Sequence, residues 1–411
     1  SINCVNCVEN DVHDMAKWMS NAGHPAGLWV GKTNDVKKCS PDTDPKGRLY
    51  WTETGLVKSG EITGNSITDV KEFFTDNKLG DSPRQIVLDD HFVYVADGGA
   101  STSVSKCKRG IGRVNKDGTD ANRRIVDGMC DASGVALDPK TTEHRWLYFS
   151  DKGIPEQEVA PSLWRLDLDE YEKDPDWPID LGVKRENLSE NTNTTYHDDL
   201  EHEFEYDLEG NLVSIKNVEG SNSIIQKLMG SGKTHSEVYG SYLALDGDNS
   251  WLYWTAKSEI KRADYSTSTD LTPNVVYTDG ASWLQGIFVD VDLDRVYYIK
   301  SKQAIKWFDP HQATVGELLG NQDKEEILAE LGDIGNELLG NKELVGASMT
   351  LAFDVDATGK GWMYWGERPA NSKGQIRAVY ICEDGSFGPE TFKILYADAP
   401  MGPYSIALDT N

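Results

Sequence analysis

The chain has 411 residues, with 68 Asp and Glu against 41 Lys and Arg, giving a formal net charge of −27 at pH 7. This acidic excess argues against nucleic acid or an anionic membrane surface as a partner, because both are bound through clusters of Lys and Arg. No run of about 18 apolar residues is present, so we expect no membrane span.

Residues 1–46 differ from the rest and are interpreted as an N-terminal extension that contains cysteines. Val12, Met15, Ala16 and Met19 recur at helical spacing and predict a short helix over 11–21. The chain holds an even number of cysteines, which suits three disulfides: Cys4, Cys7, Cys39, Cys107, Cys130 and Cys382. We expect Cys4 and Cys7 in disulfides, because no second ligand pair follows at the spacing of a zinc site.

From residue 47 onward a pattern of short strands recurs. An apolar strand ending in Asp precedes an aromatic strand, and a third strand with a basic residue follows. The aromatic strands are expected at 49–53, 93–97, 147–151, 252–256, 296–300 and 363–367, and the preceding strands at 85–89, 134–138, 242–246, 286–290 and 350–354. Four short strands per repeat are typical of the blades of a β-propeller. The sequence therefore predicts an all-β propeller over 47–411.

The two ends of this region predict how the ring closes. Residues 404–409 form a first strand with no aromatic strand after it, and the aromatic strand at 49–53 has no first strand before it. We expect the C-terminal strand to join the blade of residues 48–75, which removes exposed strand edges. Seven blades are favoured if 204–216 is a divergent copy, and six if 196–240 is an insertion. Two further insertions are expected, a polar one at 153–200 and a helical one at 314–345.

The repeat resembles the YWTD propellers of the low-density-lipoprotein receptor class B family. Tyr50-Trp51-Thr52-Glu53 and Tyr253-Trp254-Thr255 are the nearest copies of the motif, and Gly134-Val135-Ala136-Leu137-Asp138 matches the first-strand consensus. The chain departs from the family at Ala256 and Lys300, where the acid is lost, and it shows no flanking EGF-like module. The resemblance implies a similar scaffold, standalone and divergent, without implying receptor function.

Acids recur at two positions of the repeat, and we interpret both sets as structural. The resemblance implies that Glu53, Asp97, Asp151 and Glu367, which end aromatic strands, bond backbone and neighbouring blades. The acids that end the first strands are expected to cap the turns that follow them: Asp89, Asp138, Asp246, Asp290, Asp354 and Asp409.

Metal binding has two predicted locations. His197, Asp198, Asp199 and His202 form the densest group of potential ligands, which suits a transition metal. A calcium ion in the central channel is a separate possibility, because some propellers that are hydrolases or lactonases hold one there. Two glycosylation sequons, at Asn187 and Asn193, favour a secreted protein together with the cysteines.

The connections between blades are expected to share one face of the ring and to carry a binding site. Its predicted residues are Met129, Asp131, His197, Tyr239, Trp283, Met401 and Tyr404. Cys107 and Cys130 are expected to pair at this face, and Cys39 and Cys382 at the opposite one. No Gly-x-Ser-x-Gly nucleophile motif is present, so no catalytic residue is assigned.

The leading hypothesis is a secreted, non-enzymatic module that binds an extracellular protein through this face. The alternatives are a calcium-dependent hydrolase or lyase acting at the central channel, and a carbohydrate-binding propeller that uses Trp283.

Overall fold

The computed structural model describes residues 39–410 with gaps. The gaps are 75–78, 80–81, 100–106, 120–122, 139–143, 155–158, 174–177, 183–193, 197–201, 207–210, 218–222, 230–241, 267–270, 279–282, 301–303, 312–314, 320–346, 368–372, 384–386, 388–390 and 400–401. The predicted helix at 11–21, Cys4, Cys7, Asn187 and Asn193 therefore lie outside the described residues.

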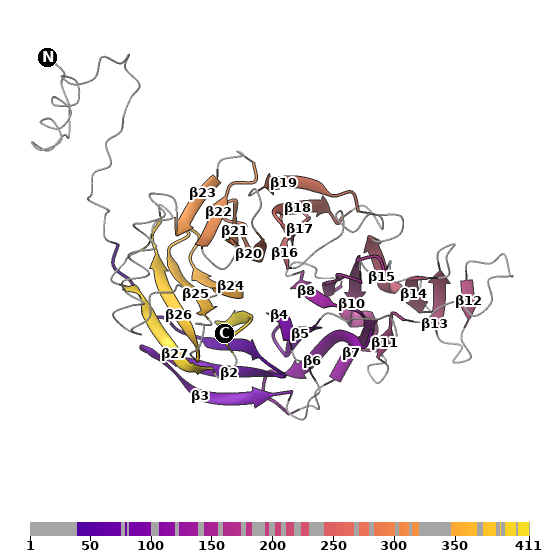
Figure 1. Cartoon of the computed structure of the whole chain (residues 1–411), viewed down its shortest axis with the longest axis horizontal. Helices are drawn as coiled ribbons and strands as arrows, with labels where there is room; N and C mark the ends of the chain where they lie inside the picture. The colour runs from indigo at the N-terminus through magenta and orange to yellow at the C-terminus, as the bar shows by residue number, and fades with distance from the viewer. Residues whose placement is uncertain are drawn as a thin grey trace, which may run out of the picture.

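Six β-sheets surround a central channel as the blades of a propeller (Figure 1). The first blade contains β28 (Ile406–Asp409), β1 (Arg48–Glu53), β2 (Leu56–Thr63) and β3 (Ser66–Phe73). The second contains β4 (Ser82–Leu88), β5 (Phe92–Gly98), β6 (Arg109–Asn115) and β7 (Arg123–Met129), with β11 (Ile179–Asp180) added in parallel to β7. Each blade begins at the channel with its first strand.

The fourth to sixth blades are four-stranded. The fourth contains β16 (Leu243–Asp246), β17 (Trp251–Ala256), β18 (Glu259–Asp264) and β19 (Asn274–Thr278). The fifth contains β20 (Leu284–Asp290), β21 (Arg295–Lys300), β22 (Ala304–Phe308) and β23 (Val315–Leu319). The sixth contains β24 (Ala347–Val355), β25 (Gly361–Glu367), β26 (Gly374–Ile381) and β27 (Lys393–Ala399).

The third blade decides the blade count. Its inner strands are β8 (Ala132–Leu137), β9 (Trp146–Asp151) and β10 (Ser162–Asp167), followed by the short helix α2 (Leu168–Tyr171). Its outer strands are β15 (Ser223–Met229), β14 (Leu212–Asn217), β13 (His202–Tyr206) and β12 (Thr194–Tyr196), which complete one seven-stranded sheet. Figure 1 shows these last strands extending outward from the ring.

The favoured prediction of seven blades is therefore wrong, and the alternative of six is correct. The divergent copy at 204–216 does not reach the channel, because β15 pairs with β10 and carries β14 and β13 on its outer edge. Two parts of the predicted insertions also differ from expectation. Residues 153–200 include β10, a central blade strand, and residues 315–319 of the predicted helical insertion form β23.

The ring closes as predicted. β28 pairs antiparallel with β1, with Trp51 opposite Ile406 and Arg48 opposite Asp409. The contact extends beyond the strands, because Thr52 and Ser405 exchange backbone and side-chain hydrogen bonds of 2.9 and 3.0 Å. Closure by both ends of the propeller leaves no open edge at the channel.

The aromatic strands are the second strands of the blades, and they form the core. Tyr50, Trp51, Tyr94, Tyr148 and Tyr253 are at most 1% exposed. Side chains from each second strand pack against both neighbouring blades, since successive residues of a strand point to opposite faces. This explains why the aromatic pattern recurs in every blade.

The prediction that the acids ending the second strands bond backbone and neighbouring blades is confirmed for Asp151, whereas Glu53 and Glu367 bond side chains of their own blades. Glu53 accepts a hydrogen bond of 2.9 Å from the Trp51 indole, and Glu367 accepts one of 3.0 Å from Trp365. The Asp151 carboxylate accepts three backbone N–H bonds, two of them from Cys130 and Asp131 at the start of the third blade.

Two disulfides confirm the predicted pairs, Cys107–Cys130 and Cys39–Cys382. The first lies on the face where second strands meet third strands, which we call the upper face. The second lies on the lower face, where first strands turn into second strands, and it ties residue 39 to the sixth blade. Among the described residues no helix is long and apolar enough to cross a membrane.

Candidate functional site at the central channel

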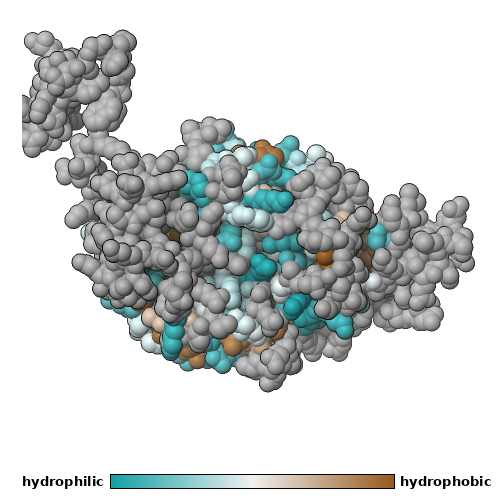
Figure 2. All heavy atoms as spheres, viewed as in Figure 1, coloured by the Kyte–Doolittle hydropathy of each residue, from teal (hydrophilic) through white to brown (hydrophobic). Residues whose placement is uncertain are grey.

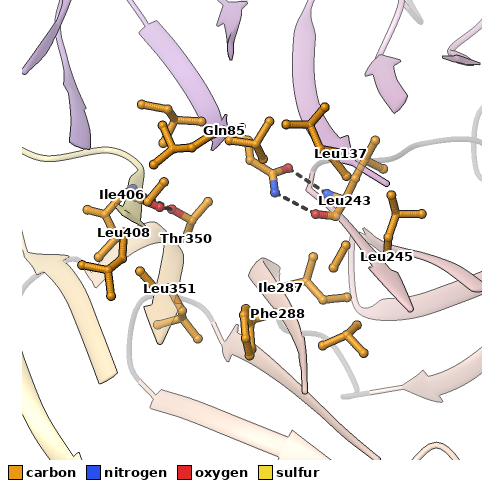
Figure 3. A pocket seen from close by; sticks show the side chains of 18 of the residues that line it. Gln85, Leu137, Leu243, Leu245, Ile287, Phe288, Thr350, Leu351, Ile406 and Leu408 are labelled. Atoms are coloured by element: carbon orange, nitrogen blue, oxygen red, sulfur yellow. Dashed lines mark hydrogen bonds between the residues drawn. The ribbon is translucent and has the colours of Figure 1, made fainter. Parts of the chain in front are cut away.

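The six inner strands enclose a cavity of about 670 Å³ on the axis of the ring. Most of its lining side chains are apolar, among them Leu137, Leu245, Phe288, Leu351 and Leu408, and polar atoms also contribute much of the lining surface (Figure 3). Figure 2 views the ring along its axis, and the described surface near the centre of the face seen there is largely hydrophilic.

Hydrogen bonds between blades cross the upper half of the channel. The Gln85 amide donates to Leu243 O at 2.7 Å and accepts from Leu243 N at 2.8 Å and Val135 N at 3.1 Å (Figure 3). One side chain of the second blade thus satisfies backbone groups of the third and fourth blades. Gly134 permits this approach, because a Cβ there would lie 2.6 Å from Leu243 Cγ.

A second set of polar side chains joins the sixth, first and second blades. Thr350 Oγ1 accepts from Ile406 N at 2.7 Å, and its hydroxyl lies 2.9 Å from that of Ser405. Ser405 Oγ accepts from Ile86 N at 3.0 Å. The sequence held a signal for this arrangement, because Gln85, Thr350 and Ser405 occupy one position of the repeat.

The lower rim of the cavity carries charge. Its lining includes the carboxylates of Asp89, Asp90 and Asp138 and the guanidinium of Arg145. Asp138 is buried and accepts a hydrogen bond of 3.2 Å from the Tyr265 hydroxyl. Burial, reinforced by the negative charge of Asp138, raises the pKa of Tyr265, so this hydroxyl remains a donor at neutral pH.

Arg145 is fixed by carboxylates around it. Its guanidinium lies 2.7 Å from Asp169, 2.6 Å from Glu172 and 3.4 Å from Asp89. Asp89 also accepts backbone hydrogen bonds from His91 and Phe92. Arg145 is therefore held in place at the rim, and its charge is largely balanced before any ligand arrives.

The prediction that first-strand acids cap their turns is confirmed at three positions. Asp89 accepts from Phe92 N at 2.6 Å, Asp246 from Asn249 N at 3.1 Å and Asp290 from Leu293 N at 3.2 Å. Burial raises the pKa of the Asp290 carboxyl, since desolvation disfavours its charged form.

The described lining of the channel does not fit a calcium ion. Calcium takes six to eight oxygen ligands, with carboxylates prominent among them. At mid-channel the side-chain oxygens of Gln85, Thr350 and Ser405 are already engaged in hydrogen bonds to neighbouring blades. At the rim, Asp89 is already occupied by two backbone N–H groups, the Tyr94 hydroxyl and Arg145.

The residues predicted for the binding face do not share one exposed surface. Met129 is fully buried in the core, and Asp131 is buried beside Arg84, 3.6 Å away. Tyr404 is half-buried with its hydroxyl 3.3 Å from that of Thr54, whereas Trp283 is 52% exposed. His197, Tyr239 and Met401 lie outside the described residues, as do Asp198 and Asp199. Of the predicted metal ligands only the backbone of His202, in β13, is described.

Sequence reasoning missed a buried cation at the upper junction of the second and third blades. Lys152 follows Asp151 at the end of β9 and is 7% exposed. Burial lowers the pKa of its ammonium to about 8, and the nearby positive charge of Arg84 adds to this effect. The same sequence position in the fourth blade, Lys257, is exposed.

Comparisons with known proteins found similar solved structures but no matching family model or curated protein. The chain is similar to the periplasmic gluconolactonase of Pseudomonas aeruginosa, at 11% identity and a TM-score of 0.47, covering 89% of this chain and 100% of that one. It is also similar to a protein of Bacteroides uniformis provisionally named 6-phosphogluconolactonase, at 12% identity and a TM-score of 0.47, covering 88% and 98%.

A propeller in a nidogen/laminin complex is also similar, at 14% identity and a TM-score of 0.30, covering 66% of this chain and 92% of that one. At these identities the likeness concerns the fold alone. Sequence and structure agree on a β-propeller, and the structure gives it six blades.

The leading functional prediction, a non-enzymatic binding module acting through the inter-blade face, is corrected by these findings. The propellers to which the chain is similar include proteins named as lactonases. The structure supplies a physical reason as well, since Met129 and Asp131 are buried and cannot meet a partner at that face.

Proposed function

We propose that the protein is a propeller hydrolase that binds a small, uncharged ester or lactone in the central cavity. The observation that carries the proposal is the cavity itself, about 670 Å³, in which an apolar wall from six blades meets the carboxylate of Asp138. Small-molecule sites have volumes of roughly 300–1,000 Å³ and combine apolar walls with a few polar groups.

Asp138 is the proposed general base. The Tyr265 hydroxyl and the backbone bond from Asp138 N to Trp146 O hold it at the rim. Asp138 removes a proton from a water molecule as the water oxygen adds to the substrate carbonyl carbon. The C–O bond to the leaving oxygen then breaks, and the proton passes from Asp138 to that oxygen, so that the products are a carboxylic acid and an alcohol.

The charge of the rim favours an uncharged substrate. Three carboxylates and one guanidinium line it, and the guanidinium is already paired with Asp89, Asp169 and Glu172. A phosphorylated or carboxylate-bearing substrate would meet like charge at the entrance. The apolar wall suits the carbon skeleton of a neutral lactone or ester.

Asp138→Asn provides the test, with Asp246→Asn as a matched control at the same repeat position of the fourth blade. Asparagine keeps an oxygen for Tyr265 but cannot act as a base at neutral pH. We expect kcat for neutral lactones or aryl esters to fall by roughly 10²–10⁴-fold with little change in KM. Equal activity of the two variants, or no hydrolysis by the wild-type protein across such substrates, would refute the proposal.

We further infer that the scaffold is a divergent YWTD propeller and that the protein is secreted. The indole-to-carboxylate bonds of Trp51 with Glu53 and Trp365 with Glu367 support the first inference. An experimental structure lacking both bonds would contradict it. Two disulfides support the second inference, because such bonds persist in oxidising compartments.

Secretion is tested on protein from its native source. We expect no reactive thiol at Cys39, Cys107, Cys130 or Cys382 under denaturing conditions, and a mass gain of about 2 Da per bond upon reduction. Four alkylated cysteines before reduction would contradict the inference.

A further inference from the structure

We propose that His144, Asp167 and Glu170 form a binding site for one divalent transition-metal ion, with Zn²⁺ as the best fit. The three side chains lie on the lower face of the third blade. One ligand atom from each lies within 4.8 Å of the other two. The site is separate from the cavity, although His144 directly precedes the rim residue Arg145.

The contact between His144 and Asp167 is the decisive observation. His144 Nδ1 lies 2.7 Å from Asp167 Oδ2, which by distance alone would be an ion pair. Both atoms are buried, and neither has a hydrogen-bond partner of acceptable geometry. A ring nitrogen and a carboxylate oxygen repel when they face each other as lone pairs, so this contact calls for a positive charge beside both atoms. A proton on Nδ1 supplies one only with poor hydrogen-bond geometry, and a metal ion bound by both atoms supplies it directly.

The orientation of Asp167 is fixed by its other oxygen. Asp167 caps helix α2, with Oδ1 accepting from Asp169 N at 3.0 Å and Glu170 N at 3.1 Å. Its side chain is 1% exposed, so Oδ2 has little freedom to turn away from His144. The local fold therefore presents this oxygen to the imidazole before any metal binds.

Glu170 supplies the third ligand. It is 8% exposed, and its carboxylate contacts the Lys173 ammonium, whose side chain is 62% exposed. An exposed ammonium contributes little to such a pair and can be displaced by a divalent ion. Metal bonds of about 2.0–2.2 Å allow two ligand atoms to lie up to about 4.4 Å apart, so only small side-chain adjustments within the 4.8 Å limit are needed for all three to bind one ion.

The ligand types select the metal. One imidazole nitrogen with two carboxylate oxygens suits Zn²⁺ and its neighbours, whereas calcium and magnesium favour oxygen ligands alone. Three protein ligands leave a fourth position for water. The His144 side chain is 31% exposed, which gives the ion a route from solvent.

The test is equilibrium dialysis of chelator-treated, full-length protein against ZnCl₂, with metal content measured by elemental analysis. We expect one saturable site per chain, weakened at least about 10-fold by His144→Gln. His311→Gln is the matched control, because His311 also faces an aspartate, Asp294, at 3.5 Å but in an exposed pair. The His311→Gln variant should bind Zn²⁺ with the same affinity as the wild-type protein.

Two further variants separate ligands from bystanders. Glu170→Gln should weaken binding, and Lys173→Met should strengthen it, because the competing ammonium is gone. Far-ultraviolet circular dichroism confirms that each variant is folded. Zinc binding that survives His144→Gln, or that is lost instead on His197→Gln, would overturn the proposal, as would the absence of a saturable site in the wild-type protein.

Discussion

The third and fourth blades begin with nearly the same sequence and diverge in what they carry. Their first strands end in Ala136-Leu137-Asp138 and Ala244-Leu245-Asp246. Asp246 caps its own turn through Asn249, whereas Asp138 lies on the rim of the cavity. The second strands end in Asp151-Lys152, where the lysine is buried, and in Ala256-Lys257, where it is exposed.

This difference teaches where function lies in a repeated fold. The aromatic second strands build the core of both blades, with Tyr148 and Tyr253 both fully buried. The third blade adds a rim carboxylate, a buried lysine, the group His144, Asp167 and Glu170, and outer strands that the fourth blade lacks. We therefore expect substitutions at matched positions of the two blades to have unequal effects.

Asp151→Ala should give the largest effect on stability. It removes the acceptor for the backbone N–H groups of Cys130, Asp131 and Gly153. Each buried donor left unsatisfied costs about 1–3 kcal/mol, so we expect the free energy of unfolding in urea to fall by roughly 3–5 kcal/mol. Ala256→Gly, at the matched position, should cost about 1 kcal/mol. Similar losses in both variants would remove the distinction between the blades.

Lys152→Met should reveal a pH-dependent effect of up to about 3 kcal/mol. The pKa of Lys152 is lowered to about 8 in the folded protein, against its ordinary value of 10.5. The folded state therefore binds fewer protons than the unfolded state between these values, so the contribution of Lys152 to stability rises as pH increases from 8 to 10.5. Below pH 8 Lys152 is charged in both states, and burying that charge lowers the free energy of unfolding by its full amount.

Removing the charge should accordingly stabilise the protein most at pH 7, and the advantage over wild type should shrink toward pH 10.5. Urea unfolding at several pH values measures this difference. Lys257→Met, in the exposed position, should show no such trend. A pH-independent difference for Lys152→Met would mean that its ammonium is not desolvated.

Phe204→Ala should have the smallest effect on global stability. Phe204 lies in β13, in the outer part of the third blade, and is 5% exposed. We expect the outer strands β12 to β14 to open locally while the ring persists, so hydrogen exchange should increase there by a large factor. Phe149→Ala, in the second strand β9, should instead lower global stability by about 3–5 kcal/mol. Equal loss of protection throughout the chain would show that the outer strands and the ring unfold as one unit.

Much of the architecture could be predicted from the sequence because the repeat is local. Strand period, aromatic content and turn residues identified the blades, and the unmatched ends at 49–53 and 404–409 identified the closure. The pairs Cys107–Cys130 and Cys39–Cys382 followed from which face each strand end occupies. The polar position shared by Gln85, Thr350 and Ser405 is visible in the repeat, but the sequence does not show that these side chains form hydrogen bonds between blades.

The sequence by itself determined that the chain is a closed β-propeller whose aromatic strands form the core, since these features depend on alternation within single strands. Tertiary structure decided the number of blades, because 202–229 reads as strands whether it reaches the channel or extends an outer edge. It also decided that Asp138 meets the cavity, that Lys152 is buried, and that His144 faces Asp167. These outcomes depend on how distant strand ends meet across the ring, which no local pattern encodes.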